Sequence, residues 1–145
     1  MGRDSQARER ILIVEDEPSV LDLIVQVMEM EGYEVVSARN GHDALALIRE
    51  TAFDFIICDV KMPDLSGEAF YEEVERGYPR LRRRIAFVTG DTFSSESIEF
   101  LDRTGAPYLL KPFNLTDLKK MVAESLERIR RQGEENDALR EEEEC

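Results

Sequence analysis

The chain has 145 residues, 42% of them hydrophobic, which is the size of one ordinary domain with a core of its own. Its 32 acidic and 19 basic residues give a formal net charge of −13. This balance disfavours a nucleic-acid binder, which needs a basic face to replace phosphate counterions, and it disfavours adsorption to an anionic membrane surface. Residues 133–145 contribute about half of the excess charge, because seven acids there accompany a single arginine.

The targeting and cysteine features indicate a cytoplasmic protein. The N-terminus lacks the apolar segment of a signal peptide, and the most apolar stretch, residues 20–30, contains charged residues and so is not expected to span a bilayer. Cys58 and Cys145 have neither metal-site spacing nor the numbers for a disulfide framework. Free thiols are typical of a reducing compartment. We expect no membrane contact by this domain.

Five short apolar runs alternate along the chain with amphipathic stretches. The runs lie at residues 11–14, 34–37, 55–58, 85–88 and 108–110. Consecutive apolar residues without alternation are typical of strands buried on both faces, as in a parallel sheet. The stretches between them repeat apolar residues with helical spacing. They predict helices over residues 18–31, 42–50, 67–76, 95–103 and 115–131.

Five strand–helix units in series predict a doubly wound α/β domain with a five-stranded parallel sheet and helices on both faces. We place this domain at residues 10–131, after an N-terminal extension of residues 1–9. Gly133 interrupts the last helical pattern, and the apolar stripe stops there. Residues 132–145 are therefore expected to form an acidic, disordered tail.

Polar residues stand directly after four of the expected strands: Glu15 and Asp16, then Asp59, Thr89 and Lys111. Ligands of doubly wound sheets bind outside the carboxyl ends of the strands, so these side chains should converge in one pocket. Carboxylates brought close together repel, and a divalent cation such as Mg²⁺ relieves the repulsion. An aspartate beside a metal, an ammonium and a hydroxyl has the equipment to accept a phosphoryl group.

The motifs ILIVEDE, CDVKMPDLSG, FVTGD and YLLKPF resemble, in this order, the receiver domain of two-component response regulators. Each motif alone is weak, but four in order over roughly residues 10–130 are specific. The resemblance implies a (βα)5 flavodoxin-like fold with strand order 2-1-3-4-5. It also implies that a histidine kinase or a histidine phosphotransfer protein phosphorylates Asp59 in a step that requires Mg²⁺ or Mn²⁺.

The resemblance further implies a role for each residue of the site. Asp16 and Asp59 would bind the metal through their carboxylates, and Lys61 through its backbone carbonyl. Glu15, where many relatives have Asp, would reach the metal through water. Lys111 would contact the phosphoryl oxygens and hold Asp59 in place beforehand.

Other positions are implied to form the switch and to tune it. Thr89 would turn inward to bond the phosphoryl group, and Tyr108 would swing inward with it. The peptide bond before Pro112 is commonly cis in the family. Lys61 and Asp91 occupy the variable positions beside the site, where their opposite charges could pair and shield the phosphoryl group from water.

The output of the signal is not encoded in a recognisable way. Few residues follow the last expected helix, so we expect no effector domain in this chain, which would be a stand-alone receiver or part of a larger chain. Its TGD and TGAPYLLKPF segments resemble receivers attached to hybrid sensor histidine kinases. The domain would be a switch that catalyses its own phosphotransfer and dephosphorylation. It would be part of a kinase only within such a hybrid.

Other functions have less support. The alternative reading is a receiver-like module that binds Mg²⁺ and partners but in which phosphorylation is vestigial; intact Asp59, Thr89 and Lys111 argue against it. An Asp-nucleophile phosphatase would need a second Asp where Lys61 stands, and no nucleotide-binding glycine motif is present. A homodimer formed on phosphorylation is plausible, although no apolar surface stripe predicts it.

Overall fold

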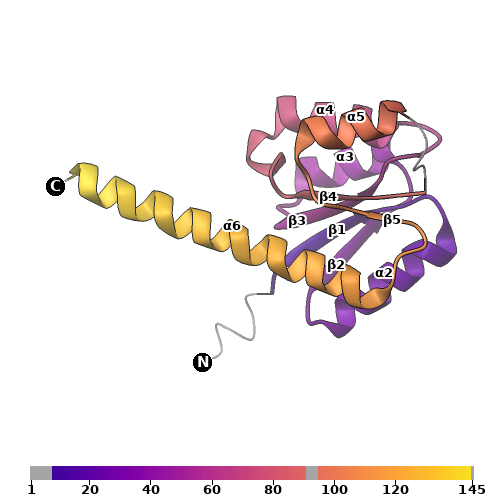
Figure 1. Cartoon of the computed structure of the whole chain (residues 1–145), viewed down its shortest axis with the longest axis horizontal. Helices are drawn as coiled ribbons and strands as arrows, with labels where there is room; N and C mark the ends of the chain where they lie inside the picture. The colour runs from indigo at the N-terminus through magenta and orange to yellow at the C-terminus, as the bar shows by residue number, and fades with distance from the viewer. Residues whose placement is uncertain (1–7, 91–94, 145) are drawn as a thin grey trace.

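The computed structural model describes residues 8–90 and 95–144, in which a five-stranded parallel sheet lies between two layers of helices (Figure 1). The strands are β1 (Arg10–Val14), β2 (Glu34–Ala38), β3 (Phe55–Asp59), β4 (Ile85–Thr89) and β5 (Tyr108–Leu110). The helices are α2 (Pro18–Met30), α3 (Gly41–Glu50), α4 (Gly67–Gly77), α5 (Ser95–Thr104) and α6 (Leu115–Glu144). A short 3-10 helix, η1 (Pro79–Leu81), precedes β4. The strand order β2-β1-β3-β4-β5 confirms the expected fold class.

Two hydrophobic cores hold the layers together. Helices α3, α4 and α5 cover one face of the sheet, and α2 and α6 cover the other (Figure 1). Successive strand residues point to opposite faces, so Leu12 and Val14 of β1 join the first core while Ile11 and Ile13 join the second. This double coverage explains why the inner strands are apolar without alternation.

The edge strands differ from the prediction of strands buried on both faces. All residues of β3 and β4 are buried, but β2 and β5 carry exposed residues, and Tyr108 and Leu110 of β5 are each 45% exposed. The physical reason is position, since β2 and β5 lie at the two edges of the sheet and each has only one neighbouring strand.

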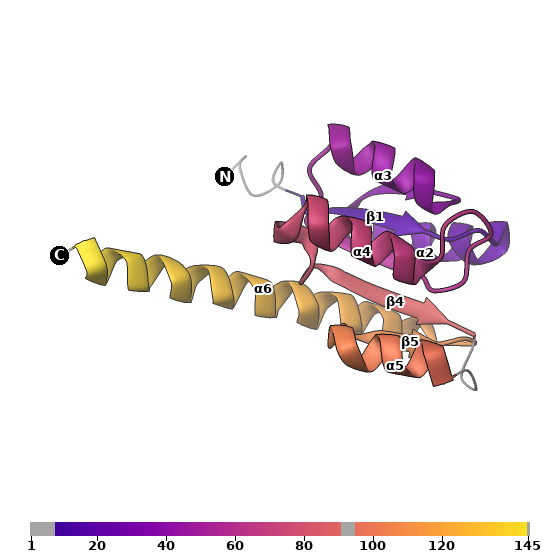
Figure 2. The same cartoon turned by 90° about the horizontal axis from the view of Figure 1, so that it is seen from above.

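Helix α6 is longer than expected and projects beyond the sheet (Figures 1 and 2). We expected it to end near residue 131, before a disordered tail, whereas the helix continues past Gly133 to Glu144. A glycine inside a helix costs only about 1 kcal/mol relative to alanine, and Glu, Ala, Leu and Arg are good helix formers. No helix in the described part of the chain has the length and apolarity to cross a membrane.

Candidate functional site

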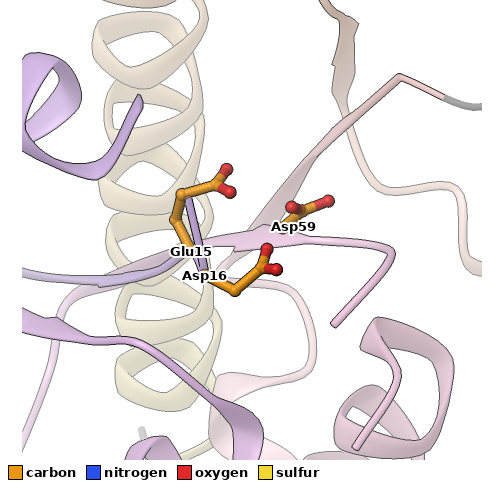
Figure 3. Close-up of side chains that lie close together, drawn as sticks. All are labelled: Glu15, Asp16 and Asp59. Atoms are coloured by element: carbon orange, nitrogen blue, oxygen red, sulfur yellow. The ribbon is translucent and has the colours of Figure 1, made fainter. Parts of the chain in front are cut away.

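Three carboxylates meet at the carboxyl ends of the central strands. Glu15 and Asp16 directly follow β1, and Asp59 is the last residue of the neighbouring strand β3. One carboxylate oxygen of each residue lies within 4.8 Å of the others, and Figure 3 shows the three groups side by side. Glu15 is fully buried and Asp59 is 3% exposed. The structure therefore brings together the three acids that the strand ends predicted.

Lys111, the residue after β5, brings a positive charge into this cluster. Its Nζ lies 3.1 Å from Asp59 Oδ2, 3.1 Å from Glu15 Oε1 and 3.3 Å from Glu17 Oε1. Burial lowers the pKa of the ammonium group, but the charge of Asp59 and hydrogen bonds to Glu15 and Asp59 outweigh it, so the pKa is raised. Lys111 thus stays charged and ties the end of β5 to the ends of β1 and β3.

The loop after β3 holds the other oxygen of Asp59. The backbone N–H of Lys61 donates a hydrogen bond to Asp59 Oδ1 at 3.1 Å. Gly67, at the start of α4, returns to the same strand end and donates to the Val60 carbonyl at 2.7 Å. A Cβ atom on Gly67 would lie 2.7 Å from the Asp59 carbonyl oxygen, so only glycine permits this approach. Both carboxylate oxygens of Asp59 are therefore fixed before any ligand arrives.

The negative charge of Glu15 is only partly compensated within the cluster. Burial, a hydrogen bond with the Asp59 carboxyl group and the charge of Asp59 together raise the pKa of Glu15 from 4.5 to about 7. The Glu17 N–H, 3.1 Å from Glu15 Oε2, and Lys111 oppose this shift only in part. Glu15 Oε1 lies near Lys111 Nζ but accepts no hydrogen bond from the described residues. The site retains negative charge that a cation could neutralise.

These observations fit a hard divalent cation. Mg²⁺ prefers oxygen ligands and is commonly held by one or two carboxylates together with water and phosphate oxygens. Glu15, Asp16 and Asp59 supply carboxylate oxygens within reach of one another, and the buried Oε1 of Glu15 lacks a donor among the described residues. The donor set and the uncompensated charge both suit Mg²⁺ or Mn²⁺.

Two further predicted residues lie on the neighbouring strands. Thr89, the last residue of β4, is fully buried, and its carbonyl accepts a hydrogen bond from the Lys111 N–H at 2.8 Å. Tyr108 begins β5 in register with Phe87 of β4 and is exposed. The Lys111–Pro112 peptide bond, expected to be cis, is cis. Asp91, the predicted partner of Lys61, lies outside the described residues.

Sequence reasoning did not foresee the roles of Glu17 and Asp64. Glu17 could be expected to cap α2, but its side chain makes no capping hydrogen bond and lies 3.3 Å from Lys111 Nζ instead. Asp64, in the loop after β3, accepts hydrogen bonds from the Gly41 and His42 N–H groups at the start of α3. These bonds outweigh the effect of burial and lower the pKa of Asp64. In the sequence, the position of Asp64 after Pro63 indicates a turn but not these hydrogen bonds to α3.

The stability of the metal-free protein should depend on the ionisation of Glu15. The pKa of Glu15 is about 7 in the folded state and near 4.5 without the fold, so the folded state holds the proton more tightly. Stability from this group is therefore complete below pH 4.5 and is lost as the pH rises to about 7. Across this range, the free energy of unfolding of wild type should fall by about 2–3 kcal/mol relative to that of Glu15→Gln. Urea unfolding of both proteins measures the difference.

The exposed residue Glu29 provides a matched control for this measurement. Glu29→Gln should unfold with a pH profile parallel to that of wild type. If the Glu15→Gln profile is also parallel to wild type, then Glu15 does not titrate in this range.

Comparisons with known proteins agree with this geometry. The response regulator receiver domain family matches residues 11–123. The transcriptional regulatory protein ZraR of Salmonella typhimurium is 32% identical over 125 residues, which are 86% of this chain and 28% of ZraR. A CheY-like receiver domain from Methanospirillum hungatei has a TM-score of 0.80 at 34% identity, covering 87% of this chain and 99% of that one. The receiver domain of a signal transduction histidine kinase from Syntrophus aciditrophicus has a TM-score of 0.76 at 30% identity, covering 85% and 93%.

The sheet order and the site, three carboxylates and a lysine at the strand ends, define the class as an α/β receiver of the CheY-like type. The chain belongs to the response regulator receiver domain family. It spans only 28% of the length of ZraR.

Proposed function

We propose that Asp59 accepts a phosphoryl group from a phosphohistidine of a histidine kinase or phosphotransfer protein, in a step that requires Mg²⁺ or Mn²⁺. The observation that carries this proposal is the environment of Asp59. Its carboxylate is buried at a strand end, Lys111 Nζ lies 3.1 Å from Oδ2, and the Lys61 N–H donates to Oδ1. A nucleophile fixed in this way loses little freedom when it meets its substrate.

The chemistry is a single in-line displacement. A carboxylate oxygen of Asp59 forms a bond to phosphorus while the bond between phosphorus and the histidine nitrogen breaks, and that nitrogen keeps the electron pair. Lys111 keeps its proton because its pKa is raised, so it can stabilise the phosphoryl oxygens as they approach Asp59. The product is an aspartyl phosphate, and no oxidant or further reactant is needed.

The metal would be held by groups that already surround Asp59. Asp16 and Asp59 would bind it through carboxylates, Lys61 through its backbone carbonyl, and Glu15 through a water molecule. Mg²⁺, when bound, offsets the charge of the carboxylates and of the incoming phosphoryl group. Without such a cation, Glu15 and Asp59 oppose the entry of further negative charge, as the raised pKa of Glu15 indicates.

The signal would pass through Thr89 and Tyr108 to the face formed by α5 and β5. A phosphoryl group on Asp59 adds negative charge beside the buried Thr89, whose hydroxyl can donate to it. Tyr108 is 45% exposed on the adjacent strand and so has little packing to lose if its ring turns inward. The phosphoryl group would thereby shift a pre-existing equilibrium of this face.

A small phosphodonor with Mg²⁺ tests this function. Intact-mass measurement should show a gain of one phosphoryl group in wild type, and the gain should disappear in Asp59→Asn and on chelation of the metal. Asp64→Asn, which removes a charge from the same loop without touching Asp59, is the matched control and should still be modified. Absence of any gain in wild type would favour the alternative, a metal-binding interaction module with vestigial phosphorylation.

Lys61 should control how long the phosphoryl group persists. We propose that its side chain, paired with Asp91, covers the site and limits the access of water. Lys61→Ala should then lose its phosphoryl group by hydrolysis several-fold faster than wild type. The rate is measured as the decay of the phosphorylated mass after the donor is removed. An unchanged rate would show that Lys61 does not shield the site. Lys120→Ala, on α6, is the control.

We further propose that this domain belongs to a hybrid sensor histidine kinase. The Syntrophus aciditrophicus domain comes from a histidine kinase, which supports a place for this chain in a hybrid sensor kinase. In such a setting the domain would act in the cytoplasm and would bind neither nucleic acid nor membrane. Exposed apolar residues on α5, β5 and the start of α6 would suit a homodimer formed on phosphorylation. They are Ile98, Tyr108, Leu110 and Leu115.

A further inference from the structure

A cavity lies at the opposite end of the strands from the three carboxylates. It has a volume of about 500 Å³, and its walls come from α4, the turn before β4, the end of α5 and α6. Ile85 in its wall is the first residue of β4, whereas Thr89 beside the carboxylate site is the last. Four residues of strand separate the two by about 13 Å. The cavity is therefore a separate site.

The walls of this cavity are strongly basic. Four arginines line it, Arg82, Arg83, Arg103 and Arg128, and Glu75 is the one acid among the lining residues that the structure describes. The chain as a whole has a net charge of −13, so composition alone does not account for this cluster. We call this site the arginine pocket.

Three of these four arginines have no carboxylate partner in the part of the chain that the structure describes. Among the described residues, no carboxylate lies within ion-pair distance of Arg82, Arg83 or Arg128. Arg103 lies 3.3 Å from Glu68 and rests over the Phe100 ring. Elsewhere, Arg10, Arg76, Arg130 and Arg131 are each paired with a glutamate, and Arg80 and Arg84 donate to backbone carbonyls. The arginine pocket thus holds an excess of positive charge that the described side chains do not neutralise.

The shape and chemistry of the pocket narrow the choice of ligand. Guanidinium groups match phosphate oxygens with paired hydrogen bonds, and a cavity of this volume suits a small molecule. Tyr71 is the one aromatic residue among the described residues of the wall. It is 7% exposed and packs against Phe87 and Phe100, so it offers no face on which a base could stack. An oligophosphate carries several negative charges in a smaller volume than a polycarboxylate does.

We propose that the arginine pocket binds a compact oligophosphate. The anion would lie among Arg82, Arg83 and Arg128, with Arg103 at its side, and would supply the negative charge that these residues lack. Binding at this site requires neither Asp59 nor a metal at the carboxylates, because Asp59 ends β3 at the opposite end of the strands. The site would therefore persist even if phosphorylation of Asp59 were disproved.

Calorimetric titration of the full chain with pyrophosphate tests the proposal. The buffer contains EDTA, so that pyrophosphate cannot bind through a metal at the carboxylates, and near-physiological salt suppresses weak surface binding. We expect one molecule bound per chain, and binding about tenfold weaker or more in the double variant Arg82→Ala/Arg128→Ala. Arg82 and Arg128 are both exposed, so the double variant should remain folded. Its melting temperature checks this.

The double variant Arg49→Ala/Arg76→Ala removes the same charge from α3 and α4 outside the pocket and should bind pyrophosphate as wild type does. Citrate at equal ionic strength should bind at least about tenfold more weakly than pyrophosphate. The proposal is overturned if wild type does not bind pyrophosphate, if both double variants weaken binding equally, or if citrate binds as tightly.

Discussion

Saturating Mg²⁺ should stabilise the protein by about 2 kcal/mol, which corresponds to a rise of about 5 °C in the melting temperature. The reason is the cluster of Glu15, Asp16 and Asp59, whose carboxylates lie within 4.8 Å of one another and are incompletely compensated by Lys111. A cation that binds only the folded state shifts the folding equilibrium toward that state. Differential scanning calorimetry with Mg²⁺ and with EDTA measures the gain.

The variant Asp16→Ala should lose most of this gain while remaining folded. It removes a proposed metal ligand, and without metal it also removes one of three mutually repelling carboxylates, so the metal-free protein should not be weakened. Asp22→Ala, which removes an exposed acid from α2, should keep the full gain. An equal response of both variants to Mg²⁺ would show that the cation acts on general surface charge rather than at the strand ends.

Replacement of Lys111 by methionine should destabilise the metal-free protein by about 2–3 kcal/mol at pH 8. Lys111 Nζ is 3.1 Å from both Glu15 and Asp59, so its loss leaves two buried carboxylates without a cation. The cost is smaller than for a fully buried pair because the lysine side chain is 17% exposed and water screens part of the charge. Urea unfolding of wild type and variant gives the difference.

At pH 5, Lys111→Met should be destabilised less, relative to wild type, than it is at pH 8. The pKa of Glu15 is about 7, so at pH 5 this carboxyl group is protonated and no longer needs a positive partner. Lys119→Met is the matched control, since the Lys119 side chain is 42% exposed and lies 3.9 Å from Glu31. A loss in Lys111→Met that is independent of pH, or no larger than that of Lys119→Met, would contradict the ion-pair network.

Much of the site could be predicted because its residues follow apolar runs directly. Asp59 and Lys111 each follow a run of apolar residues, and the carboxyl ends of parallel strands lie on the same side of a sheet. That rule requires no knowledge of the strand order. The resemblance to receivers supplied the order, which the structure confirms.

Other features depend on three-dimensional packing and could not be predicted. The full burial of Glu15 and its ion pair with Lys111 depend on how β1 and β5 end in space, and the turn of Glu17 toward Lys111 competes with capping of α2. The exposure of Tyr108 follows from its place on an edge strand. The extension of α6 past Gly133 contradicted a local signal, because flanking helix formers outweigh one glycine.

The proposed phosphorylation of Asp59 is tested most directly by locating the phosphoryl group on a single residue. After reaction with a small phosphodonor and Mg²⁺, reduction with borohydride converts an aspartyl phosphate to homoserine, and peptide mass spectrometry identifies the altered position. We expect modification at Asp59 in wild type and none in Asp59→Asn. Modification of a different residue, or none in wild type, would contradict it.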